Sequence, residues 1–173
     1  ILEVEHLRVQ FTSDSGTTTA VVDESFSIRP GETLALVGES GSGKSVTSLS
    51  VMRLVEHGGG KIVNGSIKLR CRDGRVVDLR HANKSELQHL RGSEVAMIFQ
   101  EPMTAMDPLM RIGPQVEEAL AVHTQLTKEQ RRARALEALR DVDLPAPEEI
   151  YRKYPHELSG GMARRVLLCC ALM

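Results

Sequence analysis

The chain has 173 residues, enough for one domain with a hydrophobic core and short for two. Hydrophobic residues make up 41% and charged residues 26%, as in ordinary globular proteins, and no apolar run reaches the roughly 20 residues of a membrane helix. The net charge of −1 and the aromatic content of 3% predict neither general attraction to nucleic acid nor a base-stacking surface. The three cysteines, Cys71, Cys169 and Cys170, have no spacing typical of a metal site or a disulfide framework.

The first third of the chain predicts a β-rich region. Residues 1–11 and 17–29 alternate apolar and polar side chains, and the polar residues 13–16 predict the turn between these two strands. Residues 33–37 form a short apolar run after a Pro-Gly turn, which predicts a buried strand.

Residues 38–45 read Gly-Glu-Ser-Gly-Ser-Gly-Lys-Ser and fit the pattern G-x-x-x-x-G-K-[S/T]. Glycines let backbone N–H groups approach an anion closely, Lys44 can reach β- and γ-phosphates, and the Ser45 hydroxyl can hold Mg²⁺. Residues 46–55 predict a helix whose N-terminus directs partial positive charge toward the phosphates. The alternative is a glycine-rich surface turn. The predicted strand before the loop and the helix after it favour nucleoside triphosphate binding.

Further β structure is predicted downstream of this loop. Residues 62–71 and 76–79 flank Asp73-Gly74, which is a strong signal for an antiparallel hairpin. Residues 95–99 are a short apolar run, and we expect a buried strand there.

The middle of the chain predicts helices. Residues 83–86 and 127–130 each resemble a capping box, and the second opens a helix over residues 128–142. Residues 112–123 also have helical periodicity. We therefore expect residues 105–155 to be a helical insertion between two parts of an α/β nucleotide-binding core.

A second candidate anion-binding motif, Leu-Ser-Gly-Gly-Met, covers residues 158–162. Ser159 is a suitable N-cap, and Gly160 and Gly161 leave backbone N–H groups accessible at the start of a helix. Taken alone, this motif is a weak signal, and a capped helix after a flexible turn is the favoured interpretation of it.

Three features follow one another along the chain: the phosphate loop, Gln100 after an apolar run, and the Leu-Ser-Gly-Gly motif. ATPase subunits of ABC transporters have these features in the same order, and the chain resembles them. Residues 37–47, 97–104 and 154–162 look like the oligopeptide, dipeptide and glutathione importer ATPases of bacteria, and residues 45–60 are most similar to the glutathione importer subunit. The resemblance implies an α/β P-loop NTPase core of ABC type, with an N-terminal antiparallel β subdomain and a helical subdomain. It divides the chain into three parts. Residues 1–104 would be a β subdomain and phosphate-loop core, residues 105–157 a helical subdomain, and residues 158–173 the signature motif and the start of the next helix.

The resemblance also implies roles for individual residues. Lys44 and Gln100 would be catalytic, and Ser45 and Gln100 would lie at Mg²⁺, with Gln100 also near the attacking water. Nucleotide would be bound by Phe11, Gly38, Glu39, Ser40, Gly41, Ser42, Gly43, Lys44, Ser45, Ser159, Gly160 and Gly161. Phe11 has the place of an aromatic ring that stacks on adenine, and it could equally be a core residue of the first sheet.

The implied cofactors are ATP and Mg²⁺, and the implied partners are proteins. A second nucleotide-binding domain would pack head to tail, so that Ser159–Gly161 of one domain contact the γ-phosphate held by the other. Residues 103–109 and the helices that follow them would receive permease subunits at the cytoplasmic face of the bacterial inner membrane, with a substrate-binding protein acting indirectly. No nucleic acid partner is expected.

The sequence departs from the family pattern at three places. Met162 replaces the more usual Gln and marks the peptide-importer branch, and residues 163–165 differ from the Arg-Gln-Arg familiar there. The strand that supplies an Asp for Mg²⁺ and a Glu as general base does not occur before Met173, and neither Glu101 nor Asp107 replaces these groups. We therefore expect a fragment of a longer ATPase, with one or two such domains, that hydrolyses ATP poorly by itself.

Two other functions remain open from the sequence. A non-transport ABC ATPase acting on DNA or ribosomes is disfavoured by the absence of a basic patch. A non-catalytic nucleotide-binding module would fit if the natural chain ended at Met173.

Overall fold

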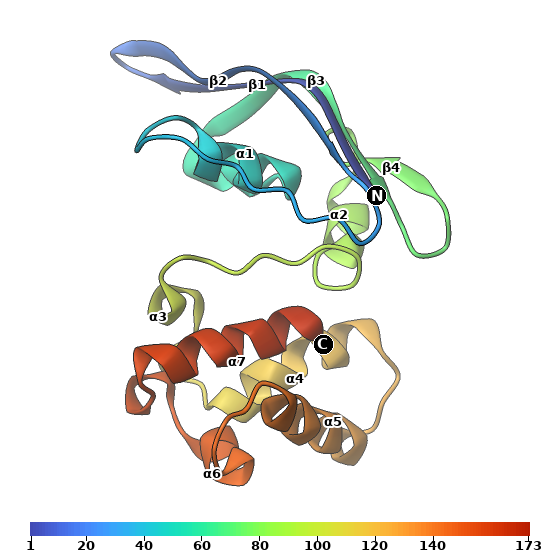
Figure 1. The fold of residues 1–173 in the computed structure, drawn as a ribbon, viewed down its shortest axis with the longest axis vertical. Helices are drawn as coiled ribbons and strands as arrows, with labels where there is room; N and C mark the ends of the chain where they lie inside the picture. The colour runs from blue at the N-terminus through green and yellow to red at the C-terminus, as the bar shows by residue number, and fades with distance from the viewer. The chain divides into compact units, whose positions relative to one another are not determined.

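The computed structural model describes residues 1–173 without a gap. The chain divides into two compact units, Ile1–Gln88 and His89–Met173, and each has its own secondary structure (Figure 1). None of its helices combines the length and the apolar composition that crossing a membrane requires.

The first unit is built on one antiparallel sheet of four strands in the order β2-β1-β3-β4. The strands are β1 (Leu2–Ser13), β2 (Gly16–Ile28), β3 (Gly60–Arg70) and β4 (Val76–Asp78). Val9 of β1 lies opposite Val21 of β2 and Ile62 of β3, so alternate β1 side chains gather on one apolar face. The predicted β-rich region and the hairpin around Asp73-Gly74 are confirmed.

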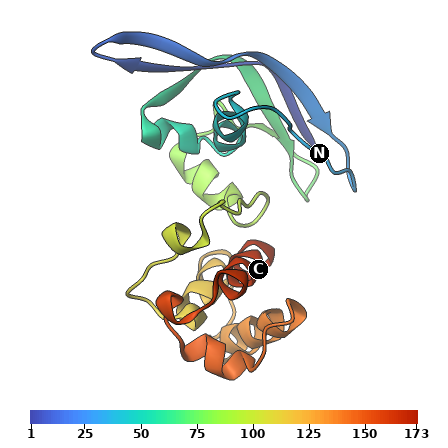
Figure 2. The same cartoon turned by 60° about the vertical axis from the view of Figure 1, so that its left-hand side comes forward.

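Helix α1 (Lys44–Val51) lies beside one face of this sheet in both views (Figures 1 and 2). It is shorter than the predicted helix over residues 46–55, because Arg53 adopts a left-handed conformation with φ of 52°. A 3₁₀ turn, η1 (Leu54–Gly58), follows and leads through Gly59 into β3. Helix α2 (Lys84–Leu90) begins after Asn83, whose Oδ1 accepts a hydrogen bond from the Glu86 N–H at 2.9 Å.

The second unit is helical. Its elements are α3 (Pro102–Ala105), α4 (Ile112–His123), α5 (Lys128–Asp141), α6 (Pro147–Arg152), the 3₁₀ turn η2 (Pro155–Glu157) and α7 (Gly160–Leu172). The predicted helix over residues 112–123 is confirmed, as is the capping box of α5, in which Thr127 and Gln130 satisfy each other's backbone N–H groups.

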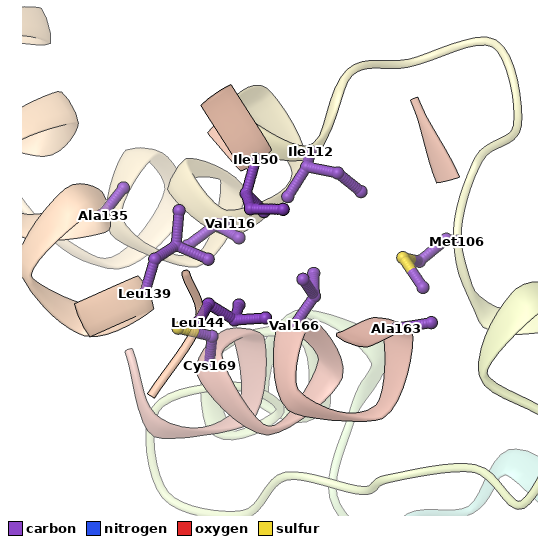
Figure 3. Close-up of a cluster of buried hydrophobic side chains, with 10 residues drawn as sticks. All are labelled: Met106, Ile112, Val116, Ala135, Leu139, Leu144, Ile150, Ala163, Val166 and Cys169. Atoms are coloured by element: carbon purple, nitrogen blue, oxygen red, sulfur yellow. The ribbon is translucent and has the colours of Figure 1, made fainter. Parts of the chain in front are cut away.

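Helices α4 to α7 enclose the core of this second unit (Figure 3). Its buried side chains are Met106, Ile112, Val116, Ala135, Leu139, Leu144, Ile150, Ala163, Val166 and Cys169. Each of these four helices contributes at least one of them. Burial of this apolar surface holds α7 in place, and α7 carries the Leu-Ser-Gly-Gly motif at its start.

The two short buried strands predicted at residues 33–37 and 95–99 are absent. Residues 33–37 have no regular structure, and Val37 is 89% exposed. In residues 95–99 only Val95 makes a strand-like bridge, to Arg91, while Ile98 and Phe99 are exposed. A strand forms only where a neighbouring strand accepts and donates its backbone hydrogen bonds, and neither segment has such a neighbour within residues 1–173.

Candidate functional site

The glycine-rich loop of residues 38–45 turns sharply before it enters α1. Gly41 and Gly43 have φ angles of 83° and 94°, a region that glycine adopts without steric cost. The Ser42 N–H donates to the Glu39 carbonyl at 3.2 Å, which closes the turn. A Cβ at Gly38 would lie 2.6 Å from Ser42 Oγ, so a side chain there would displace the Ser42 hydroxyl. The sequence therefore dictates a tight loop whose backbone is accessible.

Lys44 lies folded over this loop. Its Nζ donates to the carbonyl oxygens of Gly38 and Glu39, each at 2.6 Å, and to Ser42 Oγ at 3.2 Å. An ammonium group has three donors, and all three are directed at loop oxygens here. The cation is therefore held in the centre of the loop, where it can exchange these oxygens for those of an anion.

The N-terminus of α1 has no side-chain cap. Gly43 is the N-cap residue, and the first intrahelical bond is donated by the Thr47 N–H to the Gly43 carbonyl at 2.8 Å. The N–H groups of residues 44–46 therefore have no intrahelical acceptor, and the helix dipole adds partial positive charge at the same place. Free donors, a positive helix end and a lysine ammonium together fit a phosphate chain.

Phe11 lies in β1 opposite Gly60 of β3. A Cβ added at Gly60 would lie 2.9 Å from the Phe11 ring, so the ring covers that glycine. The side chain is half-buried, so packing on the sheet occupies one side of the ring and leaves part of it accessible. Both predicted roles, core residue and stacking ring, remain compatible with this position.

The Leu-Ser-Gly-Gly motif forms the start of α7 in the second unit. Ser159 is the N-cap, and its Oγ accepts a hydrogen bond from the Met162 N–H at 3.3 Å. A Cβ at Gly160 or Gly161 would meet no atom within 4 Å, so both glycines face open space. The motif therefore forms an open, glycine-lined N-terminus of α7, a helix of 13 residues.

The side chains of Met162 and Arg165 anchor helix α7. Met162 is half-buried and packs against the core of the second unit, while Arg165 donates to the Asp143 carbonyl at 2.6 Å. Of the residues that differ from the family pattern, Met162 and Ala163 therefore face the interior of the second unit, whereas Arg164 is exposed. The open surface at Gly160 and Gly161 is unaffected by them.

Gln100 is an exposed side chain of the second unit, between the isolated bridge at Val95 and α3. The phosphate loop belongs to the first unit and Ser159–Gly161 to the second. The predicted site residues therefore form two groups, each held by the elements of its own unit.

The adjacent glutamates Glu117 and Glu118 are predicted from the sequence to face solvent rather than to form an acid/base pair, and this prediction is wrong for Glu117. Glu117 and Glu118 fit a solvated helix face, yet Glu117 is buried and its Oε1 accepts a hydrogen bond from the Tyr151 hydroxyl. Arg132 lies over the same tyrosine ring, 5.3 Å from its centroid. Burial, followed by the Glu117 hydrogen bond, raises the pKa of Tyr151 to about 12. This cluster is internal to the helices and joins α4, α5 and α6.

Two of the three cysteine thiols, Cys169 and Cys170, have pKa values shifted by burial. Burial raises the pKa of the Cys169 thiol to about 11 and that of Cys170 to about 12, so both are protonated near neutral pH. None of the three cysteines forms a disulfide bond. No group of three or more His, Cys, Asp or Glu side chains is arranged to hold a metal ion within residues 1–173.

Comparison with known proteins identifies relatives along almost the whole chain. A family model described as ABC transporter matches residues 21–173. The chain is 48% identical over 172 residues to the glutathione import ATP-binding protein GsiA of Pectobacterium atrosepticum, and 47% identical over 172 residues to the oligopeptide transport ATP-binding protein AppD of Bacillus subtilis. These alignments cover 99% of this chain, which spans 28% of the first relative and 51% of the second.

Solved structures give the same fold. The dimeric post-hydrolysis state of the ATP-binding cassette MJ0796, bound to ADP and Pi, superposes with a TM-score of 0.80 at 25% identity, over 99% of this chain and 69% of that one. The structure of cbiO1 from Clostridium perfringens, part of the transporter complex cbiONQ, gives a TM-score of 0.69 at 26% identity, over 99% and 61% of the two chains.

Proposed function

Because this chain belongs to the ABC transporter family, we propose that it is the ATP-binding part of an importer for small peptides or glutathione. In the whole protein, ATP binding and hydrolysis would drive uptake. The names of two relatives, one for glutathione import and one for oligopeptide transport, support this substrate class.

The observation that carries the proposal is the phosphate loop itself. Residues 38–45 place the Lys44 ammonium among loop oxygens directly before an uncapped helix N-terminus. We assign Lys44 to the β- and γ-phosphates, the loop N–H groups to the phosphate oxygens, and the Ser45 hydroxyl to Mg²⁺. Gln100 is assigned to Mg²⁺ and the attacking water, and Phe11 to the adenine ring. Bound Mg²⁺ would neutralise charge on the phosphates during phosphoryl transfer.

A head-to-tail dimer is the second part of the proposal. Ser159, Gly160 and Gly161 would contact the γ-phosphate held by the loop of another nucleotide-binding domain, either a second copy or a related domain. The open space at both glycines, at the N-terminus of α7, supports this role. The dimeric state of the structurally similar cassette MJ0796 supports it too.

Permease subunits are the third part. Met103 of α3, and Leu109 and Met110 between α3 and α4, are exposed apolar side chains, and Leu109 is 86% exposed. Exposed apolar groups so close together favour a protein partner. We assign this segment to the contact with membrane subunits, which would place the protein at the cytoplasmic face of the inner membrane.

Transport by the full-length protein tests the proposal. The protein is combined with its membrane subunits in vesicles, and ATP-driven uptake of labelled glutathione and of a labelled tripeptide is compared. Lys44→Ala should abolish uptake, whereas Lys84→Ala, an exposed lysine of α2, should leave it unchanged. Uptake that is unaffected by Lys44→Ala would refute the proposal.

A further inference from the structure

A buried threonine of α1 is bound to a carboxylate of the sheet. Thr47 is 1% exposed, and its Oγ1 donates a hydrogen bond of 2.5 Å to Glu24 Oε2 of β2. Its backbone N–H closes the first turn of α1 by donating to the Gly43 carbonyl. Thr47 therefore connects β2 to the helix turn that follows the phosphate loop.

Glu24 occupies an inward-facing position of β2. Strand alternation places it in one row with Phe26 and Ile28, which are half-buried, while Ser25 and Ser27 between them are exposed. A carboxylate in such a row loses hydration and needs a compensating hydrogen bond. The Thr47 hydroxyl supplies that bond, so the pair has a specific partner and a defined geometry.

A second contact fixes the same turn. A Cβ at Gly43 would lie 2.8 Å from the Ala20 carbonyl oxygen, so the backbone at the end of the loop packs directly on β2. The first turn of α1 is therefore held at two points four residues apart, Gly43 against Ala20 and Thr47 against Glu24. Two points determine the direction of the helix axis at its N-terminus, where one would allow it to pivot.

We propose that Glu24 is a positioning residue for nucleotide binding, acting through Thr47 to fix the direction in which the N–H groups at the start of α1 face the phosphates. The inference rests on the proposed function, because the ligand is the triphosphate assigned to residues 38–45. Hydrogen-bond donors contribute to anion binding only when they are aligned with the oxygens they meet. A turn free to rotate would lose part of that alignment.

The carboxylate could instead act through its charge. A negative group near the start of a helix lowers the positive potential there, and its removal would then strengthen phosphate binding. The two roles differ for Glu24→Gln, which keeps a hydrogen-bond acceptor and removes the charge. Positioning predicts nearly unchanged binding, whereas a charge effect predicts tighter binding.

The test uses the full-length protein and measures the dissociation constant of a fluorescent ATP analogue, with kcat and KM for ATP measured in the assembled transporter. Glu24→Leu and Thr47→Val should each raise the dissociation constant and KM about five- to tenfold, with kcat changed less than about twofold. Thr47→Ser and Glu24→Gln should stay within about twofold of the wild type, because each keeps the hydrogen bond. The double variant Glu24→Leu/Thr47→Val should be no worse than either single variant, because both remove the same interaction.

Val77→Ala is the matched control for stability. Val77 is a buried residue of β4 in the same unit and pairs with Leu69, at the other end of β3 from Gly60, so its truncation destabilises the unit away from Phe11, Glu24 and Thr47. The inference is overturned if Val77→Ala raises KM as much as Glu24→Leu, or if Glu24→Leu and Thr47→Val leave nucleotide binding unchanged. Tighter binding by Glu24→Gln also overturns it. Lys44→Ala in the same assay separates the two proposals: if it weakens binding and Glu24→Leu does not, only this inference fails.

Discussion

At the scale of single residues, Tyr151 and Glu117 show how much one buried polar contact can matter. The carboxylate of Glu117 is buried on α4, and the Tyr151 hydroxyl of α6 is its donor. A buried carboxylate that loses its donor carries an uncompensated desolvation cost. The pair therefore joins two helices of the second unit only as long as both partners are present.

Removal of the Tyr151 hydroxyl tests this contact. We expect Tyr151→Phe to lower the free energy of unfolding by about 1–3 kcal/mol, the cost of one unsatisfied buried polar group. Urea denaturation of the full-length protein measures it. The matched control is Glu118→Gln, at the exposed neighbour of Glu117, which should change stability by less than about 0.5 kcal/mol. Equal effects of the two variants would contradict the assignment.

The raised pKa of Tyr151 predicts a pH dependence. Its pKa is about 12 in the folded protein and about 10 in an unfolded chain, so between these values the unfolded state binds fewer protons. Stability from this group is therefore complete below pH 10 and falls as the pH rises toward 12. Thermal unfolding between pH 9 and 12 should show a steeper loss for the wild type than for Tyr151→Phe. Parallel curves would contradict the prediction.

The burial of Glu117 was missed from the sequence, although the sequence carries a signal for it. An adjacent glutamate pair is typical of a solvated helix face. Yet residues 113, 116, 117 and 120 recur at the helical spacing of one buried stripe, and all four are buried. Helical spacing was the signal for Glu117, whereas its partner on α6 is 34 residues away and has no local signal.

At the scale of elements, helix starts follow from local sequence. Ser159 and Thr127 both accept a hydrogen bond from the backbone three residues ahead, as their capping motifs predict. The early end of α1 at Val51 has no comparable signal, because the left-handed conformation of Arg53 that follows is set by its surroundings. Strands at residues 33–37 and 95–99 could not be decided locally either, since a strand requires a neighbour.

The two caps provide a matched pair of variants. Ser159→Ala and Thr127→Ala should each lower the free energy of unfolding by about 1 kcal/mol, because each removes one N-cap. Only Ser159→Ala should also lower ATPase activity in the assembled transporter, because Ser159 is assigned to the γ-phosphate. Stability and activity are measured on the same preparations. Equal loss of activity in both variants would reduce the role of Ser159 to helix capping.

Gly43 is the glycine on which the phosphate loop depends most. It combines a φ of 94° with a Cβ position 2.8 Å from the Ala20 carbonyl oxygen. We expect Gly43→Ala to weaken ATP binding at least about tenfold, because the loop must move away from β2. Gly31→Ala is the control, since Gly31 has a φ of 74° but no atom within 4 Å of its Cβ position. It should lose stability and keep ATP affinity, and comparable affinity losses would contradict the prediction.

At the scale of the whole molecule, the family could be identified from motif order, and the comparisons confirm it. The antiparallel sheet and the helical unit also match the expectation, because their strands and helices find their partners within the chain. The composite ATP site could be proposed from the motifs alone. The roles proposed for Gln100 and Ser159–Gly161 rest on the family resemblance, because local sequence patterns do not encode them.

The most direct measurement of the central claim is ATP affinity by calorimetric titration of the full-length protein, with Lys44→Ala and the exposed-lysine control Lys84→Ala alongside. Lys44 bonds three loop oxygens in the structure and is assigned to the phosphates. We predict that Lys44→Ala weakens ATP binding at least about tenfold with little change in AMP binding, because AMP lacks the β- and γ-phosphates. Lys84→Ala should bind both as the wild type does. Unchanged ATP affinity in Lys44→Ala would contradict the account.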